Sequence, residues 1–179
     1  MPHDSYIRAI LPVQTGHAQG IIQMAVPGFD IGPSGALEMD FARCKTAISD
    51  LRQHNATHYV CLMTDDEVGA DAIMDIAELA RQSDIAFHHL PVDDYAKPDA
   101  AFLRGWEAFS PQLHASLDQG KSIVLQCLAG YGRSGTIAAL LLIERGMAAE
   151  IAIKAVQAVN GESIESDEQK RFLLARAAI

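Results

Sequence analysis

Apolar and polar residues alternate in two short segments near the N-terminus, around Tyr6–Val13 and again at Ile21–Ala25. Alternation of this kind is typical of half-buried strands, because successive side chains of a strand point to opposite faces. Thr15-Gly16 lies between the two segments, so the pattern predicts a short hairpin. Glycine and proline then crowd into Pro27–Gly35, where we expect a loop.

From residue 37 onwards, segments in which apolar residues recur every three or four positions alternate with short apolar runs. The first pattern indicates helices and the second indicates strands. The expected helices are Leu37–His54, Asp71–Gln82, Asp99–Leu117, Ser134–Arg145, Ala148–Val159 and Ser166–Ala177, and the expected strands are Thr57–Met63, Ile85–Leu90 and Ser122–Gln126. This alternation predicts an α/β fold, in which helices flank a central, twisted and mostly parallel sheet.

The length of 179 residues fits a single domain, since no repeat or low-complexity linker divides the chain. We place the N-terminal hairpin at about residues 5–26 and the core of the domain at about residues 27–178. Apolar residues make up 49% of the chain and charged residues 21%, a balance typical of a globular protein and not of a disordered one.

The net charge of −9 argues against nucleic acid or an anionic membrane as a partner. Three cysteines without framework spacing suit a reducing cytoplasm. The N-terminus lacks the basic start and apolar core of a signal peptide. The longest apolar stretch, Ile137–Ile143, is far shorter than the roughly 18 residues that span a membrane. We therefore expect a soluble, cytoplasmic protein.

The stretch LQCLAGYGRSGT, residues 125–136, holds the strongest chemical signal. Cys127 ends a buried strand and Ser134 starts a helix, so the chain must turn tightly between them, and Gly130 and Gly132 permit such a turn. A loop of this kind points several N–H groups inward, and the helix N-terminus adds about half a positive charge. The sequence therefore predicts a cradle for a phosphate or sulfate.

A cysteine at the floor of such a cradle is favoured as the thiolate, which is the nucleophilic form. We expect Arg133 at the rim, where its planar guanidinium can bind two phosphate oxygens. The hydroxyl of Ser134 can hydrogen-bond the sulfur. Together these groups predict that Cys127 attacks phosphorus and forms a phosphocysteine intermediate.

The order C-x5-R-S, from Cys127 to Ser134, resembles the signature loop of the cysteine-dependent protein tyrosine phosphatases, and the Ala-Gly-x-Gly-Arg interior is similar to the dual-specificity branch. The resemblance extends over about residues 26–175 and is greatest to the kinase-associated type; a Thr-x-x-Glu turn at Thr64–Glu67 and a Pro-x-x-Asp loop follow in the family's order. It implies the phosphotyrosine protein phosphatase-like fold. It also implies a phosphate-binding loop made of Leu128, Ala129, Gly130, Tyr131, Gly132 and Arg133.

The leaving group needs a proton from a second loop. In the family that the chain resembles, the acid commonly lies three residues after a proline that ends a strand. Pro91 plus three is Asp94, which the resemblance assigns as the general acid and then as the base for the hydrolytic water. Asp93 is the alternative, whereas Asp99 is expected to start a helix, where a carboxylate favours the helix dipole.

The predicted function is hydrolysis of phosphate monoesters on phosphotyrosine proteins. Because a short chain predicts a shallow site, phosphoserine and phosphothreonine proteins are expected as substrates too. The resemblance implies inhibition by phosphate-like oxyanions and implies no metal or cofactor. Phosphoproteins are favoured over inositol lipids, because the loop carries no lysine. Gln126 stands where the family usually has histidine, so a catalytically weak phosphopeptide-binding module is an alternative; a rhodanese-like sulfurtransferase is a second one.

Overall fold

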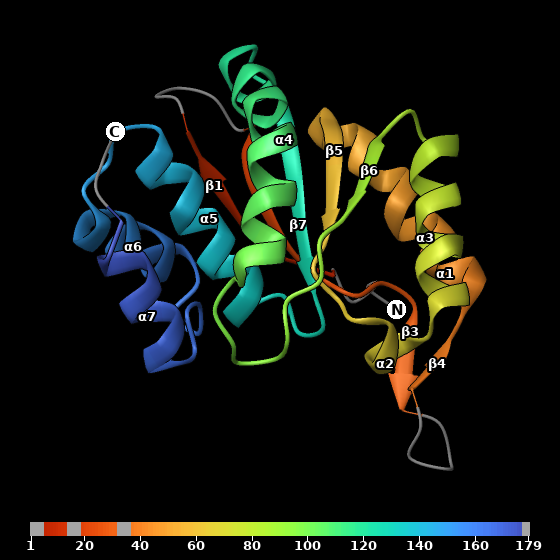
Figure 1. Ribbon diagram of the computed structural model, residues 1–179. Helices are drawn as coiled ribbons and strands as arrows, with labels where there is room; N and C mark the ends of the chain where they lie inside the picture. The colour runs from red at the N-terminus through yellow and green to blue at the C-terminus, as the bar shows by residue number, and fades with distance from the viewer. Residues whose placement is uncertain (1–5, 14–18, 32–36, 177–179) are drawn as a thin grey trace.

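The computed structural model describes residues 6–13, 19–31 and 37–176. A five-stranded sheet with the strand order β1-β2-β7-β5-β6 forms the centre of the fold (Figure 1). Neighbouring strands run parallel except at one edge, where β1 is antiparallel to β2. The strands are β1 (Ile7–Pro12), β2 (Gly20–Ala25), β5 (Ala56–Cys61), β6 (Ala86–His89) and β7 (Ser122–Cys127). The predicted hairpin and the mostly parallel sheet are both confirmed.

Helices cover both faces of this sheet (Figure 1). One face carries α1 (Phe41–Asp50) and α3 (Ala70–Gln82), with the short 3-10 helix η1 (Leu51–His54) between them in the chain. The other face carries α4 (Ala100–Asp118), α5 (Gly132–Glu144), α6 (Ala149–Val159) and α7 (Asp167–Leu174). A single turn of helix, α2 (Asp65–Val68), follows β5. The chain therefore has the three-layer α/β architecture that alternating elements predict.

The strand β7 lies in the middle of the sheet, and all six of its residues are buried. Its side chains alternate between the two hydrophobic clusters: Val124 packs with α1 and α3, whereas Ile123 and Leu125 pack with α4 and α5. A strand covered on both faces needs apolar residues at nearly every position. That is why Ser122–Gln126 reads as an apolar run and not as an alternation.

Two sequence predictions are wrong in the segment before α1. The expected loop over Pro27–Gly35 includes a strand, β3 (Phe29–Ile31), and the helix expected from Leu37 starts with a second strand, β4 (Leu37–Met39), antiparallel to the first. The helix begins only at Phe41, because the side chain of Asp40 accepts a hydrogen bond from the backbone N–H of Arg43 and caps it. Residues 32–36, and the predicted hairpin turn Thr15-Gly16, lie outside the described residues.

The parallel strands β5, β6 and β7 all end at the same edge of the sheet. The segments that follow them contain the Thr64–Glu67 turn, the Asp93-Asp94 loop and the glycine-rich loop after Cys127. Ligands of open α/β sheets bind at this carboxyl edge, so the topology alone brings the three segments together. None of the helices in residues 6–13, 19–31 and 37–176 is long and apolar enough to cross a membrane.

Candidate active site

The glycine-rich loop turns directly from β7 into α5, which begins at Gly132, two residues before the expected start. Gly130 has a φ of 80°, a conformation that L side chains rarely adopt. A Cβ atom at this position would lie 2.6 Å from the backbone nitrogen of Ala25 in the neighbouring strand β2. The glycine is therefore required twice, by its dihedral angle and by the close approach of the sheet.

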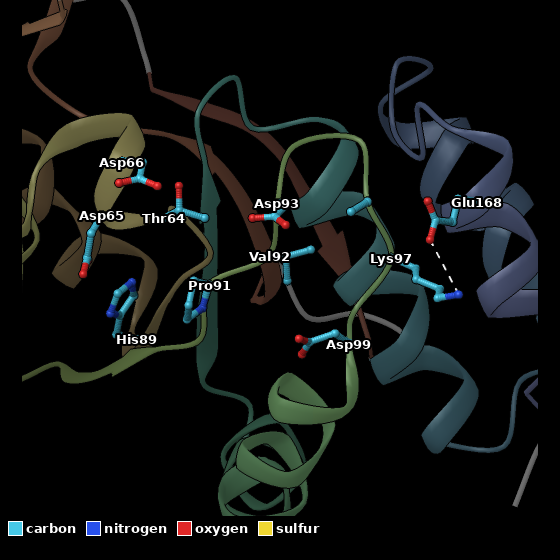
Figure 2. Close-up of a pocket in the computed structure, with 11 residues that line it drawn as sticks. Thr64, Asp65, Asp66, His89, Pro91, Val92, Asp93, Lys97, Asp99 and Glu168 are labelled. Atoms are coloured by element: carbon cyan, nitrogen blue, oxygen red, sulfur yellow. Dashed lines mark ion pairs between the residues drawn. The ribbon is translucent and has the colours of Figure 1, made fainter.

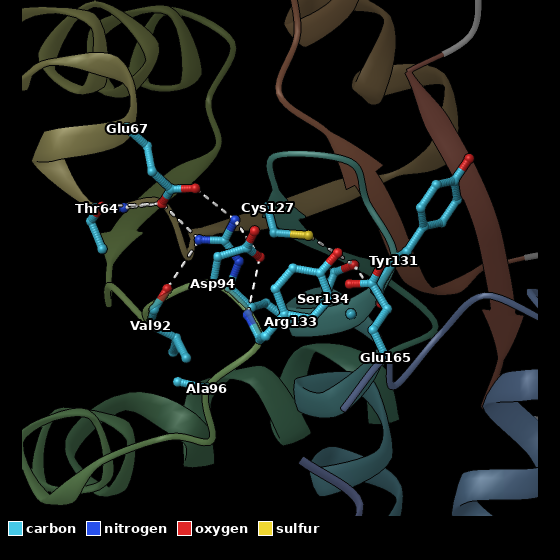
Figure 3. Close-up of polar contacts among 12 residues, drawn as sticks. Thr64, Glu67, Val92, Asp94, Ala96, Cys127, Tyr131, Arg133, Ser134 and Glu165 are labelled. Carbon is cyan, nitrogen blue, oxygen red and sulfur yellow. Dashed lines mark hydrogen bonds and ion pairs between the residues drawn. The ribbon is translucent and has the colours of Figure 1, made fainter. Parts of the chain in front are cut away.

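Cys127 lies at the base of this loop and is only 2% exposed. Its Sγ atom lies 3.5 Å from the Oγ atom of Ser134, which is fully buried in the first turn of α5 (Figure 3). The sulfur therefore lies next to the N-terminus of a helix, where the backbone dipoles favour negative charge. The structure brings the predicted nucleophile and the predicted serine together.

Arg133 is buried, with 1% of its side chain exposed, and does not lie at a solvent-exposed rim as we expected. Its Nη1 and Nη2 atoms each donate to one carboxylate oxygen of Glu67 at 2.7 Å, and Nη1 also donates to the carbonyl of Val92 at 3.0 Å (Figure 3). A guanidinium at a solvent-exposed rim would be hydrated. The guanidinium of Arg133 is buried because Glu67 supplies a bidentate partner. Within the part of the chain that the structure describes, its Nε atom has no hydrogen-bond partner.

Glu67 is the residue that the sequence did not identify as part of the site. It ends the capping box of α2: its carboxylate accepts from the backbone N–H of Thr64 at 2.9 Å and from the Thr64 hydroxyl at 3.1 Å. Burial raises the pKa of Glu67, but the hydrogen bonds from Arg133 and Thr64 outweigh burial and hold the pKa below its usual value. Burial lowers the pKa of Arg133 and Glu67 raises it, with a net increase. The pair is therefore charged.

Asp94 lies on the loop after β6, with its Oδ1 atom 3.3 Å from Nη2 of Arg133. The same oxygen accepts the backbone N–H of Tyr95 at 3.1 Å, and Tyr95 has a φ of 58°, which is uncommon for a residue with a side chain. The Asp94 side chain is 48% exposed, so the leaving group of a bound substrate can contact it. Geometry thus places this carboxylate, which the resemblance favours, at the signature arginine.

The two neighbouring aspartates lie elsewhere. Asp93 lines a cleft of about 460 Å³, together with Asp65, Asp66 and His89 (Figure 2). Asp99 caps α4 by accepting the backbone N–H of Phe102 at 2.7 Å, as its sequence position predicts.

Two other residues shape the loop from outside. Arg8 of strand β1 donates from Nε to the carbonyl of Ala129 at 3.1 Å, and its guanidinium lies 5.6 Å from the centre of the Tyr131 ring. Gln126 is fully buried and donates from Nε2 to the carbonyl of Cys127 at 3.0 Å. The amide thus braces the strand end behind the cysteine. Nothing in the sequence around Arg8 indicates its contact, because the residues it meets are more than a hundred positions away.

A second carboxylate, Glu165, extends from the connection between α6 and α7 toward the same loop (Figure 3). A Cβ atom at Gly132 would lie 1.9 Å from its Oε2 atom, so the carboxylate rests against the backbone at the start of α5. Gln169, on the following helix, is fully buried, and its side chain caps α7.

These contacts define what the arrangement can do. A thiol, a ring of loop amides and a helix N-terminus can hold an anion, and one unpaired guanidinium N–H is available to it. Two carboxylates lie at the loop, Asp94 beside Arg133 and Glu165 against Gly132, and carboxylates of this kind can serve as acids or bases. The combination is suited to nucleophilic displacement at a tetrahedral anion with separate acid–base help.

Comparison with known families matches residues 30–173 to a model described as the phosphatase domain, of the DSP-PTPase type, of a Swiss Army Knife protein. Among curated proteins, the chain is 29% identical over 129 residues to protein tyrosine phosphatase type IVA 3 of Mus musculus, an alignment that covers 71% of this chain and 68% of the relative.

Solved structures share the fold. The kinase-associated phosphatase with its catalytic cysteine replaced by serine superposes with a TM-score of 0.73 at 20% sequence identity, over 93% of this chain and 90% of that one. PTPMT1 in complex with PI(5)P superposes with a TM-score of 0.63 at 18% identity, over 87% of this chain and 88% of that one. The central sheet and its helices are therefore arranged as in these proteins.

Proposed function

The chain belongs to the Swiss Army Knife family of DSP-PTPase phosphatase domains and is a phosphatase of the dual-specificity class, and on that premise we propose that it dephosphorylates phosphoproteins through a phosphocysteine formed on Cys127. The whole chain would act as one phosphatase domain, because β2 of the N-terminal hairpin pairs with β7, the strand that carries the cysteine.

In the first step, the phosphate of the substrate binds the amides of residues 128–133. The Cys127 thiolate then forms the S–P bond while the P–O bond to the leaving group breaks, and Asp94 gives its proton to the departing oxygen. The Nε atom of Arg133 would donate to an equatorial oxygen of the transferring group, and Ser134 would hydrogen-bond the sulfur as it leaves again in the second step. In the second step, water attacks phosphorus, the P–S bond breaks, a carboxylate beside the loop takes the water proton, and inorganic phosphate is released.

The orphaned Nε atom of Arg133 carries this proposal. A buried guanidinium N–H without a partner is costly, and such groups are usually hydrogen-bonded in proteins. Both Nη atoms are bound by Glu67, so the guanidinium cannot turn to satisfy its Nε atom elsewhere. A phosphate oxygen in the adjoining cradle would supply the missing acceptor.

The test compares Cys127→Ser with Cys44→Ser, which removes a buried thiol from the other hydrophobic cluster. We expect the first variant to lose turnover of p-nitrophenyl phosphate while it still binds a phosphopeptide, and the second to keep turnover. Orthovanadate should inhibit the wild-type protein. Retained turnover in Cys127→Ser would overturn the mechanism. Phosphopeptide binding without any wild-type turnover would favour the binding module, and thiocyanate made from thiosulfate would favour the sulfurtransferase.

The substrate class follows from the charge around the site. The loop interior offers no lysine, and the chain carries a net charge of −9, which opposes binding to anionic membranes or nucleic acid. We therefore assign phosphotyrosine peptides, with phosphoserine and phosphothreonine peptides, as substrates ahead of phosphoinositides. Turnover of matched phosphopeptides should exceed turnover of phosphoinositide vesicles. All three cysteines are free and buried, which suits a reducing cytoplasm as the location.

A further inference from the structure

Glu165 has no part in the mechanism above, yet its carboxylate lies against the catalytic loop. The Oε2 atom of this carboxylate lies against the backbone of Gly132, and Gly132 is one of the loop residues whose amides would bind phosphate. The absence of a side chain at Gly132 is what allows so close an approach. The Glu165 side chain is nonetheless exposed to solvent, so water can reach it.

The segment that presents Glu165 is held in a strained conformation. Ile164, directly before it, has a φ of 64°, and a β-branched residue with positive φ is a true outlier. Gln169 clamps the segment: its Oε1 atom accepts the backbone N–H of Glu165 at 2.9 Å and that of Ser166 at 3.3 Å. Strain of this kind clusters at functional sites, where the surrounding structure enforces it.

The same segment is tied to the loop that carries Asp94. The Ser166 hydroxyl donates to the carbonyl of Tyr95 at 2.6 Å, and Nε2 of Gln169 donates to the carbonyl of Ala96 at 3.3 Å. The segments that carry the two carboxylates are therefore tied to each other beside the catalytic loop. Burial and Asp94 raise the pKa of Glu165, whereas the Gly132 N–H and Arg133 lower it, and the net direction is upward.

We propose that Glu165 is a second acid–base residue of the reaction, and that it takes the proton from the water that hydrolyses the phosphocysteine. The inference rests on the proposed function of Cys127. In this step the water oxygen forms a bond to phosphorus and the P–S bond breaks. Cys127 leaves as the thiolate, and the water proton passes to the Glu165 carboxylate. Asp94, expected from the resemblance to serve as both acid and base, then keeps only the acid role.

The contacts of the two carboxylates support this division. Asp94 is held by the Tyr95 N–H and lies near Nη2 of Arg133, the side from which a leaving group departs in the proposed first step. Glu165 lies against the backbone of Gly132, whose N–H would turn to a phosphoryl oxygen once phosphate occupies the loop. The negative charge of the phosphoryl group then makes the adjoining carboxylate a stronger base.

The experiment is rapid-quench kinetics with p-nitrophenyl phosphate on wild type, Glu165→Gln and Glu162→Gln. Glu162 is an exposed carboxylate on the same segment and controls for the loss of one negative charge. We expect an unchanged burst of p-nitrophenol in Glu165→Gln, followed by a steady-state rate lower by roughly a hundredfold, the low end of what a general base contributes. Phosphocysteine at Cys127 should accumulate and be visible by mass spectrometry. Glu162→Gln should behave as wild type.

Other outcomes would overturn the inference or the proposed function. If Glu165→Gln binds phosphate more tightly but hydrolyses the phosphocysteine at the wild-type rate, Glu165 only occupies the cradle and the inference is wrong. Glu165→Asp keeps a carboxylate and should recover part of the hydrolysis rate; equal defects in the Asp and Gln variants would also overturn the inference. A wild-type protein that forms no phosphocysteine would instead refute the proposed function, so the two failures are distinguishable.

Discussion

Replacing Glu67 by glutamine tests the main electrostatic feature of the site, the pairing of a buried guanidinium with one carboxylate. Removal of one partner from a buried ion pair typically costs about 3–5 kcal/mol. Glu67 keeps 20% of its side chain exposed, and glutamine can still accept one hydrogen bond, so we expect a smaller loss of about 2 kcal/mol. For a chain of this length, that loss corresponds to a drop in Tm of about 4–8 °C.

The same substitution should impair catalysis, because Glu67 fixes the plane in which Arg133 presents its Nε atom. If a loss of about 2 kcal/mol is also felt in the transition state, kcat/KM falls roughly 30-fold. The assays are thermal unfolding and p-nitrophenyl phosphate hydrolysis at pH 7. The matched control is Glu78→Gln, which breaks a bidentate, solvent-exposed pair with Arg81 and should change neither quantity measurably.

The Tm difference between wild type and Glu67→Gln should depend on pH with a defined sign. The pKa of Glu67 is lowered in the folded protein, so its stabilisation is fully present above the unfolded value of about 4.5 and is lost as the pH falls through the lower, folded value. The Tm difference between wild type and Glu67→Gln should therefore be constant near neutrality and shrink below about pH 4.5. Equal Tm losses in Glu67→Gln and Glu78→Gln would refute the reasoning, as would a Tm difference that grows in acid.

Two further substitutions separate roles within the site. Asp94→Asn should lower turnover of phosphopeptides by about 10²–10⁴, the usual worth of a general acid, and lower turnover of aryl phosphates with good leaving groups much less. Asp93→Asn, in the cleft that His89 lines, should have little effect, and a reversed order would move the acid to Asp93. Gly130→Ala should lose both stability and turnover, because it combines positive φ with a 2.6 Å approach to the backbone of β2. Gly146→Ala, at a φ of 90° in open space, should lose only about 1–2 kcal/mol of stability and keep its activity, as unfolding and turnover assays will show.

The sequence predicts best where structure and chemistry are local. Cys127, Arg133 and Ser134 lie within eight consecutive residues, and the dihedral demands of one tight turn explain the glycines between them. The apolar run of β7 likewise follows from burial on both faces. Helix bounds were recovered to within a few residues except before α1, where β3 and β4 depend on a pairing between residues that apolar periodicity does not reveal.

The parts of the site that the sequence missed are those supplied by distant segments. Glu67 lies 66 positions from the arginine it binds, although its capping box with Thr64 was visible as a Thr-x-x-Glu pattern. Glu165 had no such signal. Its place at the loop depends on the left-handed conformation of Ile164, which residue types do not reveal, and on the clamp from Gln169, of which only the Ser-x-x-Gln capping box is a visible pattern. The burial of Arg133 was missed for the same reason, because burial depends on a partner elsewhere in the chain.

The contact of Arg8 with the catalytic loop has a practical consequence for dissecting this protein. The matched family region starts at residue 30, but a fragment trimmed to that boundary would lose β1 and β2. It would leave β7 with an unpaired hydrogen-bonding edge directly beside the nucleophile. It would also remove Arg8, which contacts Ala129 and Tyr131. The smallest piece able to fold with an intact loop therefore extends upstream of the homology boundary, to include the hairpin.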